Sequence, residues 1–418
     1  MLKELKLSNF RLFDEEVTVR FRPITVLIGR NNSGKSSIIK FLLMLKQSLN
    51  KESTHFFNTE NTGLGNFTNI KNSLTKKEVL SFNLTVTEKR SQILYELNRY
   101  IQNQLNQDID QNVEFHIETL AQTPYQIDKE KERHEVMLHY QNKKWLIQKS
   151  DKYKFNFLDF SKELEEIPID DLEEKNVKKN IINSLQDNID NLRHLPPVRG
   201  NEKSIIITQE PSVPHVGQDG KYTLAHLQKI KNNSNYKNKY DFIIHHIQNV
   251  AGIDEIDFKR PESADISECF AMNKVTRAKT LIGNFGFGVS QCLPIFVQGA
   301  MMPQWSSLVI EQPEAQLHPT AQLEIGSFFA ELWKKYQVGS IIETHSDNIL
   351  LRLRRLIAKD YLQPEDVSVA FFNFDSYKQQ PIIKNLNIEK DGSIKEGDLP
   401  AEFFNENFNE VLKIGAGE

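Results

Sequence analysis

Residues 24–37 read ITVLIGRNNSGKSS, and this stretch decides the fold of the 418-residue chain. The β-branched run 24–28 predicts a short strand that is buried on both faces. Residues 29–34 are polar and contain two glycines, which predicts a loop. From Ser36 to residue 45, apolar side chains recur with a helical period and predict a helix. A buried strand, a glycine loop and a helix therefore follow one another without interruption.

The loop matches the pattern G-x-x-x-x-G-K-[ST] from Gly29 to Ser36. In this pattern the glycines let backbone N–H groups curl around phosphate oxygens, and the lysine, here Lys35, neutralises the β- and γ-phosphates. Ser36 offers a hydroxyl to Mg²⁺, and the helix N-terminus adds its positive end. The alternative is an ordinary glycine turn, but the flanking strand and helix favour a phosphate loop. The candidate nucleotide contacts are Gly29, Arg30, Asn31, Asn32, Ser33, Gly34, Lys35, Ser36 and Ser37.

Residues 307–314, SLVIEQPE, form a second segment that contains candidate functional residues. A hydrophobic strand that ends in a carboxylate is where phosphate-loop proteins hold Mg²⁺, so Glu311 joins Ser36 as a candidate metal residue. The next position usually carries a carboxylate that polarises the attacking water, but here it is Gln312. An amide orients water without accepting its proton, which predicts slow hydrolysis, and Glu314 is the candidate replacement. The other interpretation is that both glutamates are solvated turn residues.

Two histidines follow these carboxylates in the chain. His345 stands at the carboxyl end of the predicted strand GSIIETHSD, beside the predicted phosphate site, where it could contact a γ-phosphate. A structural role is the alternative for this single histidine. The role of His318, in the segment LHP, stays open.

Residues 286–291, GFGVSQ, precede another predicted helix. Glycines and a serine at a helix N-terminus make a second surface that suits a phosphate. Without further context, a glycine bend between a strand and a helix is the preferred interpretation of this segment. The candidate phosphate contacts are Gly288, Ser290 and Gln291.

The composition is that of an ordinary globular protein, with 39% hydrophobic and 26% charged residues. The formal charge of −4 removes the bulk electrostatic argument for nucleic-acid binding, although a local basic patch stays open. No apolar run approaches the ~20 residues of a membrane span, and the N-terminus lacks a signal-peptide core. Two cysteines make no disulfide scaffold. We therefore expect a cytoplasmic protein without a membrane partner.

The pattern of strands and helices divides the chain into four expected parts. Alternating strands and helices in 1–84 and 191–365 predict a mostly parallel sheet. Between them, 85–190 contains polar helical stretches around two strand-like runs, VEFHIETL and EVMLHYQNKKWLIQ, and is interpreted as an inserted α+β lobe. Residues 366–418 hold two predicted strands and an acidic end, and are expected to form a small C-terminal domain.

Taken in this order, the segments resemble the ATPase head of the ABC superfamily, in its RecF/SMC/OLD branch. The opening LKLSNFRLF with the phosphate loop resembles the start of such heads, FGFGVSQCLPI their signature, VIEQPEAQLHP their Walker B strand and ETHSD their His switch. A bacterial AAA-type subset is similar in further segments, here LGNFTNI, PPVRG and GFGVSQCLP. That subset often ends in a short domain of unknown function, which GSIKEGDLPAEFFNENFNEV resembles. The likeness covers roughly 1–84 and 190–418.

The resemblance implies an α/β P-loop NTPase head, a mixed sheet flanked by helices, with the lobe 85–190 inserted. In this superfamily two heads sandwich two ATP molecules with Mg²⁺, and each signature completes the other subunit's phosphate loop. The chain is thus expected to be an ATPase that forms a homodimer or higher oligomer, with Gln312, Glu314 and His345 as catalytic residues. A further implication is a role in bacterial defence, in which the ATPase controls a separate, nuclease-like effector.

The sequence departs from the family pattern in several places. Ser290 is followed directly by Gln291 instead of the usual Ser-Gly-Gly-Gln order, and Gln47 is a weak candidate for the Q-loop. Only 73 residues follow His345 and they contain no Asp-x-Asp cluster, which predicts that no Toprim nuclease is built in. Two rival functions stay open. One is a RecF-like DNA-repair ATPase, with DNA as its partner, and the other is a non-catalytic scaffold that ATP clamps together.

Overall fold

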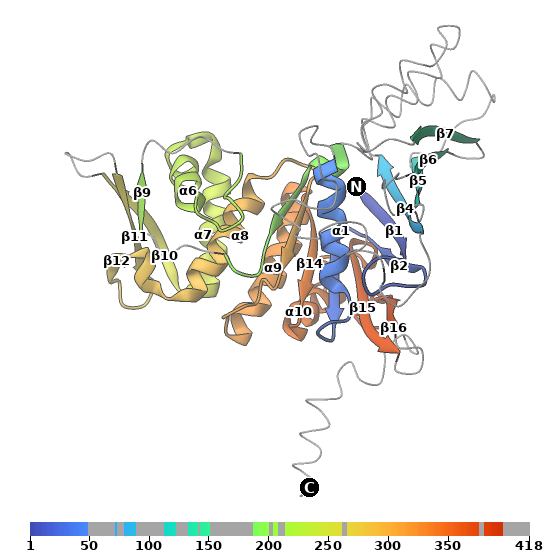
Figure 1. The fold of residues 1–418 in the computed structure, drawn as a ribbon. Coiled ribbons are helices and arrows are strands. Elements are labelled where there is room, and N and C mark those ends of the chain that lie inside the picture. The colour runs from blue at the N-terminus through green and yellow to red at the C-terminus, as the bar shows by residue number, and fades with distance from the viewer. Residues whose placement is uncertain are drawn as a thin grey trace, which may run out of the picture.

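In this computed structural model, strand β3 (Ile24–Gly29) and helix α1 (Lys35–Ser48) flank the predicted phosphate loop, as the sequence pattern predicts. β3 is buried along almost its whole length because it lies inside a six-stranded sheet (Figure 1). The structure describes residues 1–48, 72, 79–88, 113–122, 133–140, 143–150, 187–199, 204–207, 214–260, 266–375 and 380–395.

The strand order in this central sheet is β16-β15-β3-β14-β13-β8. Neighbouring strands are parallel from β15 to β8, and only β16 runs antiparallel. β14 therefore separates the strand before the phosphate loop from the strand that ends in Glu311. This mixed sheet confirms the predicted fold class. Its strands are β8 (Leu192–Leu195), β13 (Ser307–Glu311), β14 (Gly339–Thr344), β15 (Val367–Asp375) and β16 (Gln380–Leu386).

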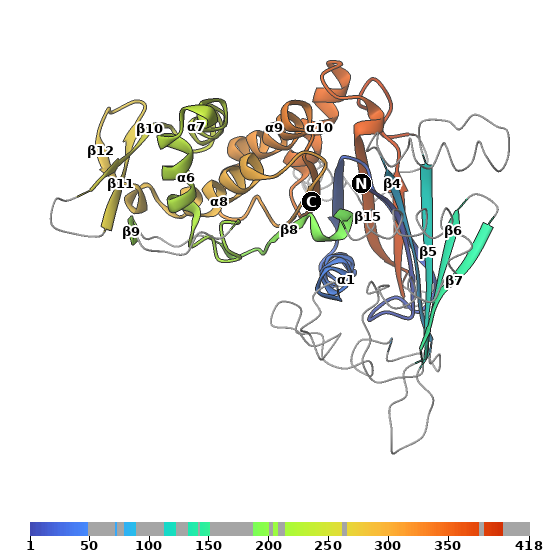
Figure 2. The same ribbon diagram turned by 90° about the horizontal axis from the view of Figure 1, so that it is seen from above.

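Helices cover both faces of the central sheet. Across the central sheet, the chain runs from β3 to β8 in one direction and from β13 through β14 to β15 in the other. Because such connections are right-handed, the helices after β13 and β14 lie on the face opposite to the helix after β3. Figure 2 shows this arrangement, with α1 on one side and α9 and α10 on the other. The predicted helices after Gly286 and His318 are confirmed. They are α8 (Phe287–Met301) and α9 (Pro319–Tyr336), and α10 (Asp347–Ala358) follows β14.

A second, antiparallel sheet begins with the N-terminal strands and has the order β2-β1-β4-β5-β6-β7. Three of its strands, β5, β6 and β7, come from the segment expected as an inserted lobe, and they extend the edge formed by β4. The run EVMLHYQNKKWLIQ is two strands rather than one. LGNFTNI and most of the predicted helical stretches lie outside the described residues, and residues 187–190, near the end of the second stretch, are helical. The bounds are β1 (Leu2–Ser8), β2 (Val17–Arg20), β4 (Val79–Glu88), β5 (Val113–Gln122), β6 (Arg133–Tyr140) and β7 (Lys143–Ser150).

A third sheet and two helices extend from the central sheet on the side of β8 (Figure 2). Its strands pair in the order β10-β11-β12, and β9 also pairs with β11. Short 3-10 turns at residues 234–236, 282–285 and 364–366 link elements. The elements of this part are β9 (Ile205–Ile207), α6 (Thr223–Asn232), α7 (Lys237–Ala251), β10 (Ile253–Lys259), β11 (Ile266–Asn273) and β12 (Lys279–Leu281).

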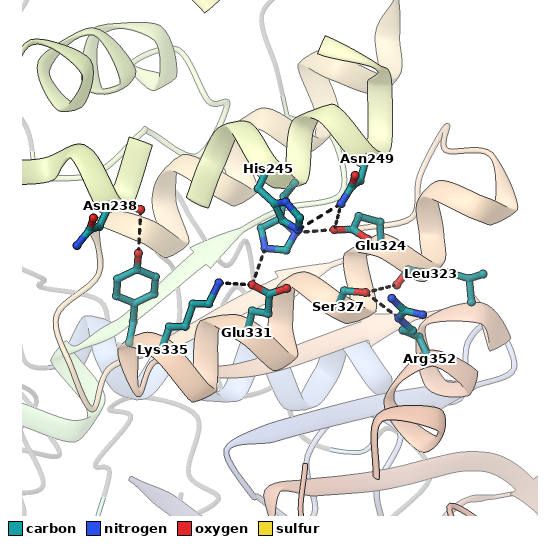
Figure 3. Close-up of polar contacts among 11 residues, drawn as sticks. Asn238, His245, Asn249, Leu323, Glu324, Ser327, Glu331, Lys335 and Arg352 are labelled. Atoms are coloured by element: carbon teal, nitrogen blue, oxygen red, sulfur yellow. Dashed lines mark hydrogen bonds and ion pairs between the residues drawn. The ribbon is translucent and has the colours of Figure 1, made fainter. Parts of the chain in front are cut away.

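A polar network connects α7 to α9 (Figure 3). The rings of Phe242, Phe296 and Phe328 lie against His246 in this interface. His246 is fully buried, and its Nδ1 lies 2.7 Å from Oε1 of Glu324. Asn249 donates to the same oxygen at 3.1 Å, while Glu331 lies 3.8 Å from Nε2 of His246 and accepts from Lys335 at 2.6 Å. The network gives the buried imidazole a partner, as a polar group in a core requires.

The C-terminal strands belong to the central sheet. β15 pairs with β3, and β16 pairs with β15, so both strands of the segment expected as a small domain complete the head. Residues 396–418 lie outside the described residues. In the part of the chain that the structure describes, no helix has both the length and the apolar character needed to cross a membrane.

Candidate functional site

Two glycines shape the loop between β3 and α1. Gly29 has a φ of 141°, and a Cβ there would lie 1.9 Å from the carbonyl oxygen of Phe372. Gly34 has a φ of 101°, and a Cβ would lie 2.5 Å from the ring of Phe13. Both positions therefore require glycine, because any side chain would meet a clash in a strained backbone. Glycines at these positions are what a loop that wraps its backbone around a phosphate requires.

The side chain of Lys35 folds back and contacts the backbone at the start of its own loop. Its side chain is 4% exposed, and Nζ donates to the carbonyl oxygens of Gly29 at 2.9 Å and Arg30 at 2.6 Å. Burial lowers the pKa of Lys35, while the charges of Glu343 and Glu314 act in the opposite direction. Ser33 donates to the carbonyl oxygen of Arg30 at 2.7 Å and supports the same turn. The ammonium group is thus held in place at the N-terminus of α1.

Ser36 faces a carboxylate that the sequence analysis did not single out. Its hydroxyl donates to Oε1 of Glu343 at 2.8 Å. Glu343 lies in β14 and is 4% exposed, and burial raises its pKa to about 7. Its Oε2 is buried and has no hydrogen-bond partner among the described residues. The available signal was an acidic residue inside the apolar strand GSIIET, since a buried carboxylate requires a reason.

Glu311 lies directly beside Glu343, because the two residues are register partners in the parallel strands β13 and β14. Its Oε1 lies 2.7 Å from Nε2 of His194, which comes from the neighbouring strand β8. The carboxylate predicted to hold Mg²⁺ is therefore paired with a histidine that the sequence analysis did not identify. Glu311 and His194 are both half-buried at the carboxyl edge of the sheet.

The turn after β13 holds two of the three predicted catalytic residues, Gln312 and Glu314, and the third, His345, follows β14. Gln312 has a φ of 46°, and its N–H donates to the carbonyl oxygen of Glu343 at 2.7 Å. Oε1 of Glu314 accepts from the backbone N–H of His345 at 2.8 Å, and burial raises the pKa of Glu314. Partial burial and the charge of Lys35 lower the pKa of His345. The structure thus brings Glu314 and His345 close to Lys35, while Gln312 lies in the same turn as Glu314.

Arg199, in the segment PPVRG, is hydrogen-bonded to the backbone of this turn. It is 1% exposed, and burial lowers its pKa to about 10. Its guanidinium donates to the carbonyl oxygens of Glu311 at 2.7 Å, Gln312 at 2.7 Å and Gln291 at 3.1 Å, and also to that of Pro196 at 2.6 Å. The arginine therefore connects the carboxylate turn to helix α8.

The glycine segment before α8 is distant in sequence from the turn after β13, but Arg199 contacts both the helix and the turn. Gly286 has a φ of 88° and precedes α8, and Gly288 and Ser290 lie in the first turns of that helix. Gln291 is 1% exposed, and its Oε1 accepts from the N–H of Arg199 at 3.3 Å. The structure thus directs Gln291 into the protein, whereas Ser290 is half-buried.

Two weaker candidates occupy structural positions. His318 precedes α9, and its Nδ1 accepts from the N–H of Thr320 at 3.3 Å, which is a helix cap. Gln47 lies in the last turn of α1, twelve residues after Lys35, or about 18 Å along the helix axis. Its own helix therefore holds Gln47 far from the phosphate loop.

A glycine loop between a buried strand and a helix, with carboxylates on β14 and on β13 beyond it, defines a P-loop NTPase head with a mixed sheet. The family of AAA ATPase domains matches residues 1–350, and the chain belongs to that family. Among curated proteins, none matches the sequence.

Solved structures of SMC heads are similar in fold. The SMC head domain from Thermotoga maritima is 10% identical, with 93% of this chain and 99% of that chain covered and a TM-score of 0.43. An Smc head bound to the C-winged helix domain of ScpA is 13% identical, with 93% and 98% covered and a TM-score of 0.43. An Smc head with an extended coiled coil, from Pyrococcus furiosus, is 10% identical, with 100% and 98% covered and a TM-score of 0.45. No functional conclusion follows from similarities this low.

Proposed function

We propose that this protein binds ATP with Mg²⁺ and hydrolyses it slowly. One observation carries the proposal: Lys35 and Ser36 stand at the N-terminus of α1 and face a group of carboxylates at the carboxyl edge of the sheet. A phosphate chain in the loop would replace the carbonyl oxygens that Lys35 now contacts.

The residues present fit a magnesium ion. The Ser36 hydroxyl and the carboxylate of Glu343 are oxygen donors, which Mg²⁺ prefers. The buried Oε2 of Glu343 has no partner in the described chain, and a cation would provide one. A bound Mg²⁺ would neutralise the negative charge of the phosphate oxygens. Ser36 and a glutamate, Glu311 or Glu343, would hold it.

Slow hydrolysis is supported by the residue after β13. Gln312 presents an amide where a carboxylate would accept a proton from water. Glu314 lies two residues on, and its raised pKa gives it more affinity for a proton than an exposed glutamate has. Glu314 is therefore our candidate for the base, and His345, whose N–H binds the same carboxylate, is our candidate γ-phosphate contact.

We further propose that ATP joins two copies of the chain. The phosphate loop leaves one side of a γ-phosphate open, and the segment 286–291 offers glycine backbone and the Ser290 hydroxyl at a helix start. A partner subunit's segment could close the site. This would make the protein a homodimer or higher oligomer.

The biological role we propose is the regulatory ATPase of a bacterial defence system that controls a separate nuclease-like effector. This step rests on the family resemblance of the motifs and is an analogy, since one fold serves many functions. DNA binding, as in a RecF-like repair ATPase, is the competing role.

The direct test is ATP binding by the purified protein and by Lys35→Ala. We expect the parent to bind ATP in a Mg²⁺-dependent way and Lys35→Ala to lose binding, because the charge opposite the β- and γ-phosphates is removed. Lys40→Ala, on the same helix, is the matched control and should bind like the parent. Unchanged affinity in Lys35→Ala would refute the phosphate-loop assignment.

Gln312 also supports a second candidate, a scaffold that ATP clamps without useful turnover. Steady-state phosphate release separates the two functions. Release that Lys35→Ala abolishes supports the ATPase, whereas ATP binding with no release above that variant supports the scaffold.

A further inference from the structure

We infer that Glu343, rather than Glu311, is the carboxylate that holds the nucleotide-bound divalent cation together with Ser36. The inference rests on the proposed ATP binding and adds a residue from β14 to that site. The carboxylate at the end of β13, the usual position, would then have a different task.

The first reason is the position of β14 in the sheet. Adjacent strands lie about 4.8 Å apart, and β14 is the immediate neighbour of β3 whereas β13 is one strand further away. Glu343 and Glu311 stand at the same level because they are register partners. The side chain on β14 is therefore one strand closer to the phosphate loop.

The second reason is the direct contact with the loop. Oε1 of Glu343 accepts from the Ser36 hydroxyl at 2.8 Å. In phosphate-loop proteins this serine is the hydroxyl that meets Mg²⁺. A carboxylate in hydrogen-bond contact with that hydroxyl stands where the cation's oxygen ligands or its bound waters must lie.

The third reason is that Glu311 already has a partner. Its Oε1 lies 2.7 Å from Nε2 of His194 on β8, the strand on the side away from the loop. Among the described residues Glu343 has no histidine partner: its Oε1 accepts from Ser36, and its Oε2 is buried without a hydrogen bond. A buried carboxylate oxygen without a partner is costly unless a cation completes it.

The surrounding charges point the same way. Glu311, Glu314 and Glu343 lie together at this edge, whereas the two nearby cations direct their hydrogen bonds elsewhere. Lys35 donates to backbone carbonyls of its own loop, and Arg199 donates to backbone carbonyls behind the turn. The negative charge of the carboxylates therefore exceeds the positive charge that contacts them, and a divalent cation would balance it.

The test compares cation dependence in matched variants of the full chain. Binding of a non-hydrolysable ATP analogue is measured with Mg²⁺ and with EDTA, and Mn²⁺ binding in the presence of the analogue is followed by electron paramagnetic resonance. Glu343→Gln keeps the shape and its hydrogen bond with Ser36, and should lose about 10–100-fold in Mn²⁺ affinity. Glu311→Gln tests the rival ligand, and by this inference should retain Mn²⁺ affinity within a few-fold of the parent.

Each outcome decides the matter. Retained Mn²⁺ affinity in Glu343→Gln overturns the inference, and so does an equal loss in both variants, because the cation would then depend on β13 as well. Thermal unfolding of nucleotide-free Glu343→Gln checks its fold, and Glu343→Asp, which keeps the charge, should recover part of the Mn²⁺ affinity. If the parent binds no nucleotide, the proposed function fails. If the parent binds it with cation dependence and Glu343→Gln does the same, only this inference fails.

Discussion

Arg199 donates from Nη2 to the carbonyl oxygen of Gln312 at 2.7 Å, and this bond ties the turn after β13 to a buried side chain. The same guanidinium reaches the carbonyl oxygen of Gln291 in α8 at 3.1 Å. The turn that carries the candidate catalytic residues and the helix that follows the signature-like segment are therefore connected through one residue.

Replacing Arg199 should strongly destabilise the protein. Arg199→Met keeps the apolar stem but leaves buried carbonyl oxygens without donors, which should lower the free energy of unfolding by about 3 kcal/mol or more. Urea unfolding measures this. Arg193→Met is the control, because Arg193 is half-buried and donates to carbonyl oxygens nearby in sequence, so it should lose about 1 kcal/mol or less. Equal losses in both variants would contradict the role of Arg199.

The network around Glu324 should make stability sensitive to acid. Burial alone would raise the pKa of Glu324, but hydrogen bonds from His246 and Asn249 lower it below the ordinary value of 4.5. The unfolded chain therefore takes up a proton before the folded one as pH falls, so this stabilisation is present above pH 4.5 and is lost below it.

Glu324→Gln should reduce this acid dependence and lower the free energy of unfolding at pH 7 by about 1–3 kcal/mol. Urea unfolding of the parent and of Glu324→Gln is measured between pH 3 and pH 7, and both proteins keep His245 and Lys335. Glu331→Gln should have a smaller effect, because Glu331 lies 3.8 Å from His246. A parallel pH dependence in the parent and Glu324→Gln would show that the network does not act in this way.

Turnover should be slow and should respond to the carboxylates of the turn. We expect a rate below the ~10 s⁻¹ median of enzymes, because Gln312 cannot accept a proton. Gln312→Glu should preserve or raise the rate, and Glu314→Gln should lower it. Phosphate release at saturating ATP and Mg²⁺ is the measurement. A rate lost in Gln312→Glu and unchanged in Glu314→Gln would indicate another base.

ATP should promote self-association through the segment before α8. Ser290→Arg adds bulk and charge there, and should leave nucleotide binding by one chain nearly intact while it blocks ATP-dependent association and turnover. Sedimentation with and without ATP compares it with the parent. Thr276→Arg, on the exposed turn between β11 and β12, is the control and should associate normally. An unaltered response of Ser290→Arg to ATP would mean that residues 286–291 form only a bend.

Much of the architecture could be predicted because its signals are local. The glycine spacing from Gly29 to Gly34, the apolar period of α1 and the β-branched run of β3 each lie within a few residues and need no distant partner. The alternation of strands and helices around Glu311 and His345 likewise predicts a mostly parallel sheet, which the structure confirms. The sequence by itself thus determined the phosphate loop and the fold class.

The partners of the charged residues were decided only by tertiary structure. Glu343 meets Ser36 across 307 positions of chain, and Glu311 meets His194 across 117, because strand order and register bring them together. Arg199 finds carbonyl partners in two other segments, 92 and 113 positions further along the chain. A sequence pattern encodes the period of a strand or helix, but long-range pairing depends on which strands become neighbours, and packing of the whole core selects them.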